Sequence, residues 1–241
     1  MTATQAQAPG WHGKLPSLGD FASRRLDASF IEPWDGWLAA GLLALREARP
    51  DSWLESYLGS PSWRFLLMPG VMPGTGPGQA GAQAWAGVLM PSVDRVGRYF
   101  PLTVVQPLQA GPGSTQDMAA LWQWLGRLDE LARDALFEDW TADKLEQELA
   151  RMALPALSPL SPARGAGPEP PPAPGQLVAV PGSGDAALHI GAQAQRAWAE
   201  AAQGQAWWHA RPDEGAPQLL MSRGLPSAAA LARLFGPAAT M

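Results

Sequence analysis

The chain has no cysteine and only three histidines, and each shortage excludes some chemistry. Without cysteine the protein has neither a disulfide nor a thiolate that could act as a nucleophile or metal ligand. The histidines His12, His189 and His209 have spacings that match no zinc-binding pattern. His12 and His209 stand beside tryptophans, where a structural role is the simpler interpretation. We therefore expect no metal site.

Positive charge is too scarce and too scattered for a nucleic-acid-binding surface. Charged residues make up 16% of the 241 residues, and the formal net charge is −5. The only close basic groups are Arg24-Arg25 and the Arg95/Arg98 pair, whereas contact with a phosphate backbone needs a broad basic face. Nucleic acid is therefore not expected as a partner.

Long hydrophobic runs are missing as well. No stretch approaches the ~20 apolar residues that cross a bilayer. Residues 1–9 have neither the charged start nor the apolar centre of a secretion signal. The sequence therefore predicts a soluble protein without membrane insertion, and a cytoplasmic location is compatible with the absence of cysteine.

Apolar side chains and tryptophan are abundant. Hydrophobic residues account for 46% of the chain, and there are twelve tryptophans. The length suits one large domain or two small ones, with enough apolar residues for a substantial core. Most tryptophans stand inside apolar runs, which favours core packing, and the alternative is that a few lie at a partner-binding surface.

Helical periodicity marks four segments of the first 153 residues. The predicted helices span residues 29–48, 51–58, 117–136 and 141–152, each with apolar side chains every three or four positions. The start of the first helix has two candidates. Ser29 has capping-box spacing with Glu32, whereas Pro33 is well suited to be the first helical residue.

Three shorter segments, residues 63–68, 85–90 and 102–106, carry apolar side chains on both faces and are predicted strands. Both faces of such a sheet need cover, which helices on either side provide. The connection between the last two strands is too short for a parallel crossover, so this pair should be antiparallel. The predicted fold class is α/β, a three-layer sandwich with a mainly antiparallel central sheet and helices on both faces. The side chains expected in its core are Trp63, Phe65, Val88, Met90, Val104, Leu121 and Leu125.

Composition divides the chain into four parts. A mobile tail over residues 1–9 precedes an α/β part over 10–153, and a proline-rich linker over 154–175 leads to a C-terminal part over 176–241. A proline-rich ligand for a small recognition domain is the alternative interpretation of the linker. The C-terminal part has a predicted helix over 193–203, hairpin strands over 206–209 and 218–221, and a last helix capped by Ser227. So small a part is marginal alone, so we expect it to complete the same domain and extend its sheet.

No catalytic apparatus is visible. Gly76, Gly78 and Gly81 have the G-x-G-x-x-G spacing of a dinucleotide site, but the segment leads into a strand and not into the helix that would receive a pyrophosphate. No nucleophile turn of the G-x-S-x-G type occurs. Paired carboxylates such as Asp129-Glu130 fall on a predicted helix, where solvation explains them. Neither a catalytic residue nor a cofactor is expected.

The strongest polar candidates are Asp94, Arg95 and Arg98, which lie between two predicted strands. Two guanidiniums within four residues can bind a carboxylate or phosphate in bidentate fashion, which suits a partner surface or a small anion. The alternative is structural. In that case Asp94 accepts backbone hydrogen bonds in a turn, while an arginine holds the turn to a neighbouring element.

A second polar segment, near the N-terminus, poses the same question. Lys14, Ser17 and Asp20 could contact a partner. Alternatively, Asp20 caps a turn that Gly13 and Gly19 permit. Together the two segments supply six candidate residues for a partner-binding or structural polar loop.

The two polar segments belong to a series of short, uncommon sequence motifs. In order, these are GKLPSLGDF (13–21), WDGW (34–37), WRFLLMPG (63–70), GVLMPSVDRVGRYFPL (87–102), WW (207–208) and RGLP (223–226). Together they resemble the TagF (ImpM) family of bacterial type VI secretion-associated proteins, most densely between residues 11 and 108.

The resemblance implies a cytoplasmic accessory protein that represses assembly of the type VI secretion apparatus after translation. The partners that the resemblance implies are a scaffold protein with a forkhead-associated domain or other secretion components. The protein is not expected to be an enzyme. Two alternatives remain open. One is a small enzyme or anion-binding domain that uses the Asp94/Arg95/Arg98 loop, and the other is a structural subunit associated with the baseplate.

Overall fold

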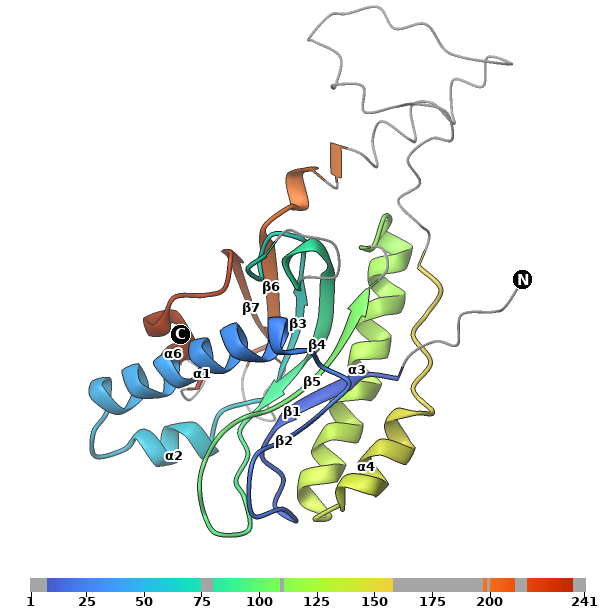
Figure 1. Ribbon diagram of the computed structural model, residues 1–241. Coiled ribbons are helices and arrows are strands. Elements are labelled where there is room, and N and C mark those ends of the chain that lie inside the picture. Colours follow the sequence, from blue (N-terminus) through green and yellow to red (C-terminus); the bar gives the residue numbers. More distant parts are fainter. Residues whose placement is uncertain are drawn as a thin grey trace, which may run out of the picture.

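The structure is a computed structural model, and it describes residues 8–74, 80–108, 111–157, 197–198, 200–210 and 216–235. Most of the predicted tail and of the proline-rich linker lies outside these ranges. His189 and two glycines of the G-x-G-x-x-G segment, Gly76 and Gly78, also lie outside them. The described part consists of one sheet and the helices that flank it (Figure 1).

Seven strands form an open sheet in which every neighbouring pair is antiparallel. They are β1 (Gly10–Gly13), β2 (Ala22–Arg24), β3 (Trp63–Leu67), β4 (Ala84–Met90), β5 (Leu102–Leu108), β6 (Gln205–Ala210) and β7 (Gln218–Arg223). Their order across the sheet is β2-β1-β5-β4-β3-β6-β7. The predicted antiparallel pairing of β4 with β5 is confirmed. Because β6 pairs with β3 along the whole of β3, strands from both parts of the chain share the sheet.

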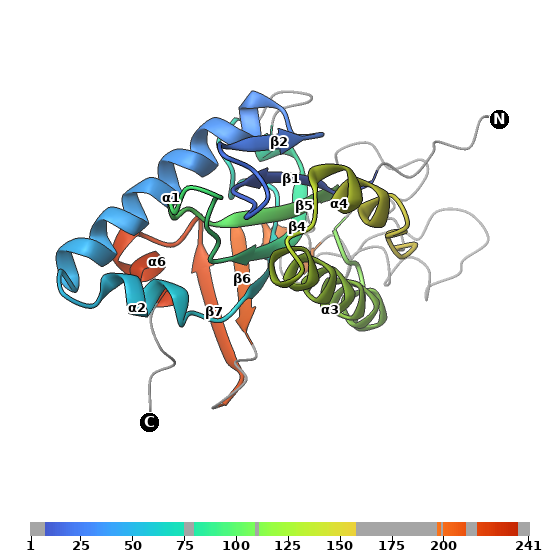
Figure 2. The ribbon, with the colours of Figure 1, turned by 90° about the horizontal axis from the view of Figure 1, so that it is seen from below.

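The helices lie on both sides of this sheet. They are α1 (Ala28–Ala48), α2 (Trp53–Leu58), α3 (Thr115–Phe137), α4 (Ala142–Leu149) and α6 (Ala228–Leu234). Figures 1 and 2 show α1, α2 and α6 on one side and α3 and α4 on the other. Residues 197–198 and 200–202, within the helix predicted over 193–203, are helical as well.

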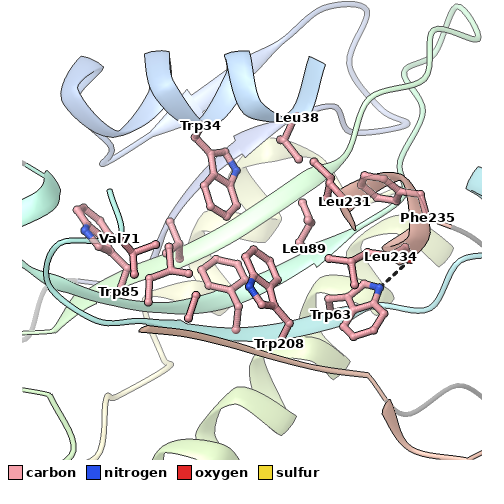
Figure 3. Packing of buried hydrophobic residues seen from close by; sticks show 14 of the residues in the cluster. Trp34, Leu38, Trp63, Val71, Trp85, Leu89, Trp208, Leu231, Leu234 and Phe235 are labelled. Carbon is pink, nitrogen blue, oxygen red and sulfur yellow. Dashed lines mark hydrogen bonds between the residues drawn. The ribbon is translucent and has the colours of Figure 1, made fainter. Parts of the chain in front are cut away.

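The side of the sheet that faces α1 holds a core rich in aromatic side chains (Figure 3). Phe65 packs against both Trp34 and Trp208, with ring centroids 5.2 Å and 5.0 Å away, and all three are fully buried. The indole N–H of Trp63 donates to the carbonyl oxygen of Leu234 at 2.9 Å, which ties α6 to β3 (Figure 3). Since large aromatic rings bury much apolar area, these tryptophans are core residues.

The opposite face of the sheet packs against α3. The buried stripe of this helix recurs every three or four residues and comprises Leu121, Trp124, Leu125, Leu128, Ala132 and Ala135. Ser114 caps α3, because its hydroxyl oxygen accepts a hydrogen bond from the amide of Asp117 at 3.0 Å. All seven core side chains expected from the sequence are at most 3% exposed, so the predicted strands and α3 are confirmed.

The structure corrects the start of α1 and adds two strands. The helix begins at Ala28, one residue before the predicted span 29–48, and contains Pro33 in its interior. Its N-cap position is Asp27, so the capping role considered for Ser29 and the start considered at Pro33 are both wrong. Asp27 precedes the helix without a side-chain cap. Strands β1 and β2 were not predicted, because four and three residues are too few to show a strand period. The predicted cap of α6 is confirmed: the Ser227 hydroxyl accepts from a backbone amide of the first turn.

Candidate functional site

Two loops meet at one end of the sheet (Figure 1). Loop A, residues 14–21, joins β1 to β2, and loop B, residues 91–101, joins β4 to β5. They meet because β1 pairs with β5, which places the end of β1 beside the start of β5. Gly13 permits this approach: its φ is +131°, and a Cβ there would lie 2.1 Å from the carbonyl oxygen of Pro101.

A buried ion pair joins the two loops. Lys14 Nζ lies 2.5 Å from Asp94 Oδ2, and the two residues are only 2% and 3% exposed. The ring of Phe21 covers the ammonium group, with its centroid 4.5 Å from Nζ. The hydroxyl of Ser92 donates to the carbonyl oxygen of Lys14 at 2.7 Å. Loop B therefore holds Lys14 through both its side chain and its backbone.

The Asp94 carboxylate also organises loop B itself. Oδ1 accepts from the amides of Val96 and Arg98, at 3.0 Å and 2.9 Å. Oδ2 accepts from Arg98 Nε at 2.7 Å in addition to the bond from Lys14. At the tip, Gly97 has a φ of +82°, and its amide donates to the Asp94 carbonyl oxygen at 3.0 Å. Four donors therefore occupy the acceptor sites of one carboxylate.

These donors determine the protonation state of Asp94. Burial by itself raises the pKa of the carboxyl group, but the hydrogen bonds from Lys14, Arg98 and Val96 outweigh burial and hold the pKa well below its usual range. Asp94 is therefore ionised at neutral pH. A carboxylate with filled lone pairs and a depressed pKa is a poor proton acceptor, so it is unsuited to general-base catalysis.

Two further residues of loop B, Arg98 and Arg95, contact loop A. The guanidinium of Arg98 donates through Nη2 to the carbonyl oxygen of Gly19 and lies 3.6 Å from Asp20 Oδ1. The amide of Arg95 donates to the carbonyl oxygen of Leu18 at 2.8 Å. The two loops therefore form one connected unit.

The outer side chains of this unit face solvent. At the tip of loop B, Arg95 is exposed and Val96 is 63% exposed. Within the described ranges, the Arg95 guanidinium makes no hydrogen bond or ion pair. In loop A, Phe21 is 47% exposed, although its ring centroid lies 4.9 Å from that of Phe100. We call Phe21, Arg95 and Val96 the loop-tip surface.

The remaining two candidates from the sequence belong to loop A. The Ser17 hydroxyl donates to the carbonyl oxygen of Trp140 at 2.7 Å, which fastens the loop to the turn between α3 and α4. Asp20 is exposed, and its Oδ1 accepts from the amide of Phe21 at 2.8 Å. All six candidate residues therefore lie in the two loops that meet here.

Two further contacts, made by Tyr57 of α2 and by Asp35 of α1, support the unit, and sequence analysis predicted neither. The Tyr57 hydroxyl accepts from the Ser92 amide at 2.8 Å and donates to the Ser92 carbonyl at 2.9 Å. Burial raises the pKa of the Tyr57 phenol far above its ordinary value, and the bond with Ser92 offsets this only in part. His12 Nε2 lies 3.2 Å from Asp35 Oδ1, and the His12 ring stacks on Phe21. No motif in the sequence links these residues.

Two further polar clusters in the described chain join parts of the fold. Asp129 is only 6% exposed and accepts hydrogen bonds from Ser62 and from Arg64 Nη2, the latter at 3.0 Å, so the expectation that solvation explains this carboxylate is wrong. Glu146 on α4 accepts from the Trp11 indole and pairs with Arg25.

In the described ranges, no group of three or more histidine, aspartate or glutamate residues is placed to hold a metal ion. Nor does any helix in them have both the length and the apolar character needed to cross a bilayer. His209 lies against Trp122, with ring centroids 6.4 Å apart. Gly81 belongs to a single 3-10 turn, and the chain then enters β4.

Fold and site define a mixed α/β protein with a seven-stranded antiparallel sheet, whose main polar cluster holds two surface loops together. The TagF N-terminal domain, described as type VI secretion system-associated, matches residues 10–152. Because this match covers more than half of the sequence, the chain belongs to the TagF family.

A solved structure extends the similarity to almost the whole chain. The crystal structure of PA0076 from Pseudomonas aeruginosa PAO1 is 32% identical in sequence and has a TM-score of 0.70. The alignment covers 97% of this chain and 96% of that chain. No curated protein matches the sequence. The resemblance to the TagF family that the short sequence motifs suggested is confirmed.

Proposed function

We propose that this TagF-family protein is a post-translational repressor of type VI apparatus assembly, which acts in the cytoplasm by protein contact. The observation that carries the proposal is the unit formed by loops A and B. A buried ion pair, Lys14–Asp94, holds both loops in one conformation, while the loop-tip surface stays exposed. Such preorganisation favours binding, because little conformational entropy is lost when a partner docks. Family membership supplies the secretion system in which the contact is made.

The same geometry argues against catalysis or capture of a free anion at this cluster. Asp94 is ionised and fully hydrogen-bonded, Lys14 is buried against it, and Arg98 is committed to it. Within the described ranges, Arg95 is the arginine of these loops whose guanidinium has no partner. A single guanidinium without converging donors binds a small anion weakly. We therefore infer that the protein is not an enzyme and uses no cofactor.

The partner we propose is a protein of the type VI secretion system. The scaffold protein with a forkhead-associated domain is the first candidate, because resemblance to the family implies it. A repressor that binds such a component keeps it from joining the apparatus. The effect then lies in assembly, and the amounts of the apparatus proteins stay constant.

Overproduction in a bacterium with an active type VI system tests this function. We expect secretion of exported proteins into the medium to fall, while immunoblots of cell extracts show unchanged amounts of apparatus proteins. Equal overproduction of an unrelated soluble protein controls for expression load. Unchanged secretion, or a parallel fall in the apparatus proteins, contradicts the proposal. A fixed stoichiometry of this chain in purified apparatus supports the baseplate-subunit alternative instead.

We also propose that residues 10–153 and 176–241 form a single domain, arranged as a three-layer sandwich. The pairing of β6 with β3 supports this organisation. So do two hydrogen bonds between the parts, from the Trp63 indole to Leu234 at 2.9 Å and from the Trp37 indole to the Pro226 carbonyl at 2.7 Å. The helices on the two sides of the sheet supply the outer layers of this sandwich, and each side has its own buried core against the sheet (Figure 2).

A further inference from the structure

The tip of loop B is held by several hydrogen bonds although its outer side chains are exposed. Asp94 and Arg98 supply most of its internal hydrogen bonds, yet Val96 between them is 63% exposed. A buried ion pair adds little net stability compared with apolar packing, but separating its two groups leaves an uncompensated buried charge, so the groups stay together in the folded protein. The Lys14–Asp94 pair therefore serves to present the tip in a defined conformation.

The charges of the two loops leave one arginine without a counter-charge. Lys14 pairs with Asp94, and Arg98 lies against both Asp94 and Asp20. Arg95 makes no ion pair or side-chain hydrogen bond in the described part of the chain. Loops A and B thus carry three cations and two carboxylates, a local excess of one positive charge on a protein whose net charge is −5.

Exposed apolar side chains accompany the unpaired guanidinium. Phe21 is 47% exposed and comes from loop A, which the Arg95 backbone contacts through the Leu18 carbonyl oxygen at 2.8 Å. Val96 follows Arg95 directly in loop B. Arginine and aromatic residues are enriched among the residues that dominate binding energy at protein interfaces. A guanidinium also offers a planar fork of donors that matches a carboxylate.

We propose that the loop-tip surface binds an acidic segment of a type VI secretion protein. A carboxylate of that segment accepts hydrogen bonds from Arg95, and an adjacent apolar side chain packs against Val96 and Phe21. The inference rests on the proposed function, since it names the surface and the chemistry of the contact through which the repressor acts.

Photo-crosslinking from the loop tip tests the surface directly. The full chain, with p-benzoylphenylalanine in place of Val96, is irradiated in an extract of a bacterium with an active type VI system. Mass spectrometry then identifies the crosslinked peptides. We expect a peptide from a type VI secretion protein that contains aspartate or glutamate at or beside the crosslinked residue. A crosslinked segment without acidic residues, or one that carries a phosphate, overturns the assignment.

Charge reversal gives the second arm. Capture of the type VI proteins by Arg95→Glu should fall about tenfold or more relative to wild type, because opposed charges across an interface repel. Arg127→Glu is the matched control, since Arg127 is an exposed arginine that belongs to α3 and to neither loop, and its variant should capture as wild type does. Equal melting temperatures of the three proteins establish that the fold is intact, which the exposure of Arg95 predicts.

The outcomes distinguish a failure of the proposed surface from a failure of the proposed function. If wild type and Arg95→Glu capture the same type VI proteins equally well, the loop-tip surface is wrong, while repression by contact stands. If wild type captures no type VI protein at all, both proposals fail. A loss of capture in Arg127→Glu as large as that in Arg95→Glu overturns the surface, because it shows a general effect of charge.

Discussion

Replacement of Tyr57 by phenylalanine should destabilise the protein through the loss of one oxygen atom. The Tyr57 hydroxyl is buried between α2 and loop B, where it bonds to both the amide and the carbonyl of Ser92. In Tyr57→Phe the Ser92 carbonyl keeps its bond from the amide of Phe100 at 3.1 Å. The Ser92 amide loses the acceptor that it has within the described chain. The Ser92 hydroxyl donates to the carbonyl oxygen of Lys14, so a displacement of Ser92 also affects the backbone that carries the ion-paired Lys14 side chain.

The magnitude follows from that unpaired amide. A buried N–H without an acceptor costs about 1–3 kcal/mol. The ring stays in place, so lost packing adds little. In a protein of this length each kcal/mol lowers the melting temperature by about 2–4 °C. The Tyr57→Phe protein should therefore melt about 2–12 °C below wild type.

Thermal unfolding at pH 7, followed by circular dichroism, measures the shift. Tyr99→Phe is the matched control, because the same atom is removed from a hydroxyl that makes no hydrogen bond in the described ranges. We expect the control to melt close to wild type. A Tyr57→Phe protein that melts with wild type, or a control that loses as much, would refute the role assigned to the Tyr57 hydroxyl.

Three further predictions concern stability. The pKa of Asp94 is lower in the folded than in the unfolded chain, so the folded state binds fewer protons, and its stability is lost as pH falls below about 4. Melting temperature should therefore drop more steeply with acid in wild type than in Asp94→Asn, and equal slopes would contradict this. Leu125→Ala in the core should lose about 2–5 kcal/mol in urea titrations, whereas Leu43→Ala on the exposed side of α1 should lose less than about 0.5 kcal/mol. Ser227→Ala should cost about 0.5–2 kcal/mol through the lost cap of α6, and a loss near zero would show that the cap is dispensable.

The parts of the fold that sequence predicts well are those with long apolar patterns. α3 and the strands β3, β4 and β5 repeat their apolar side chains often enough for the period to be read directly. β1 and β2 have no such pattern, and they exist as strands because β1 pairs with β5, which is remote in sequence. The capping residue of α1 was predicted wrongly. Ser29 and Glu32 have the spacing of a capping box, but the helix begins after Asp27, which makes no side-chain cap, so no capping signal marks the true start.

The candidate site was predictable as a set of residues but not as a structure. Asp94 and Arg98 are close in sequence, so a shared turn could be expected. The buried partner of Asp94 is Lys14, 80 residues away, and only the pairing of β1 with β5 brings the two together. Tyr57 reaches Ser92 from a separate helix. Long-range contacts of this kind leave no periodic trace in the sequence.

The most direct test of repression by contact is a count of assembled apparatus in living cells. A fluorescent apparatus protein makes each assembly visible while wild-type protein or Arg95→Glu is overproduced to the same level. We expect wild type to lower the number of assemblies per cell at constant abundance of the fluorescent protein, and Arg95→Glu to leave the number close to that of uninduced cells. An unchanged number of assemblies with wild type would contradict repression by contact.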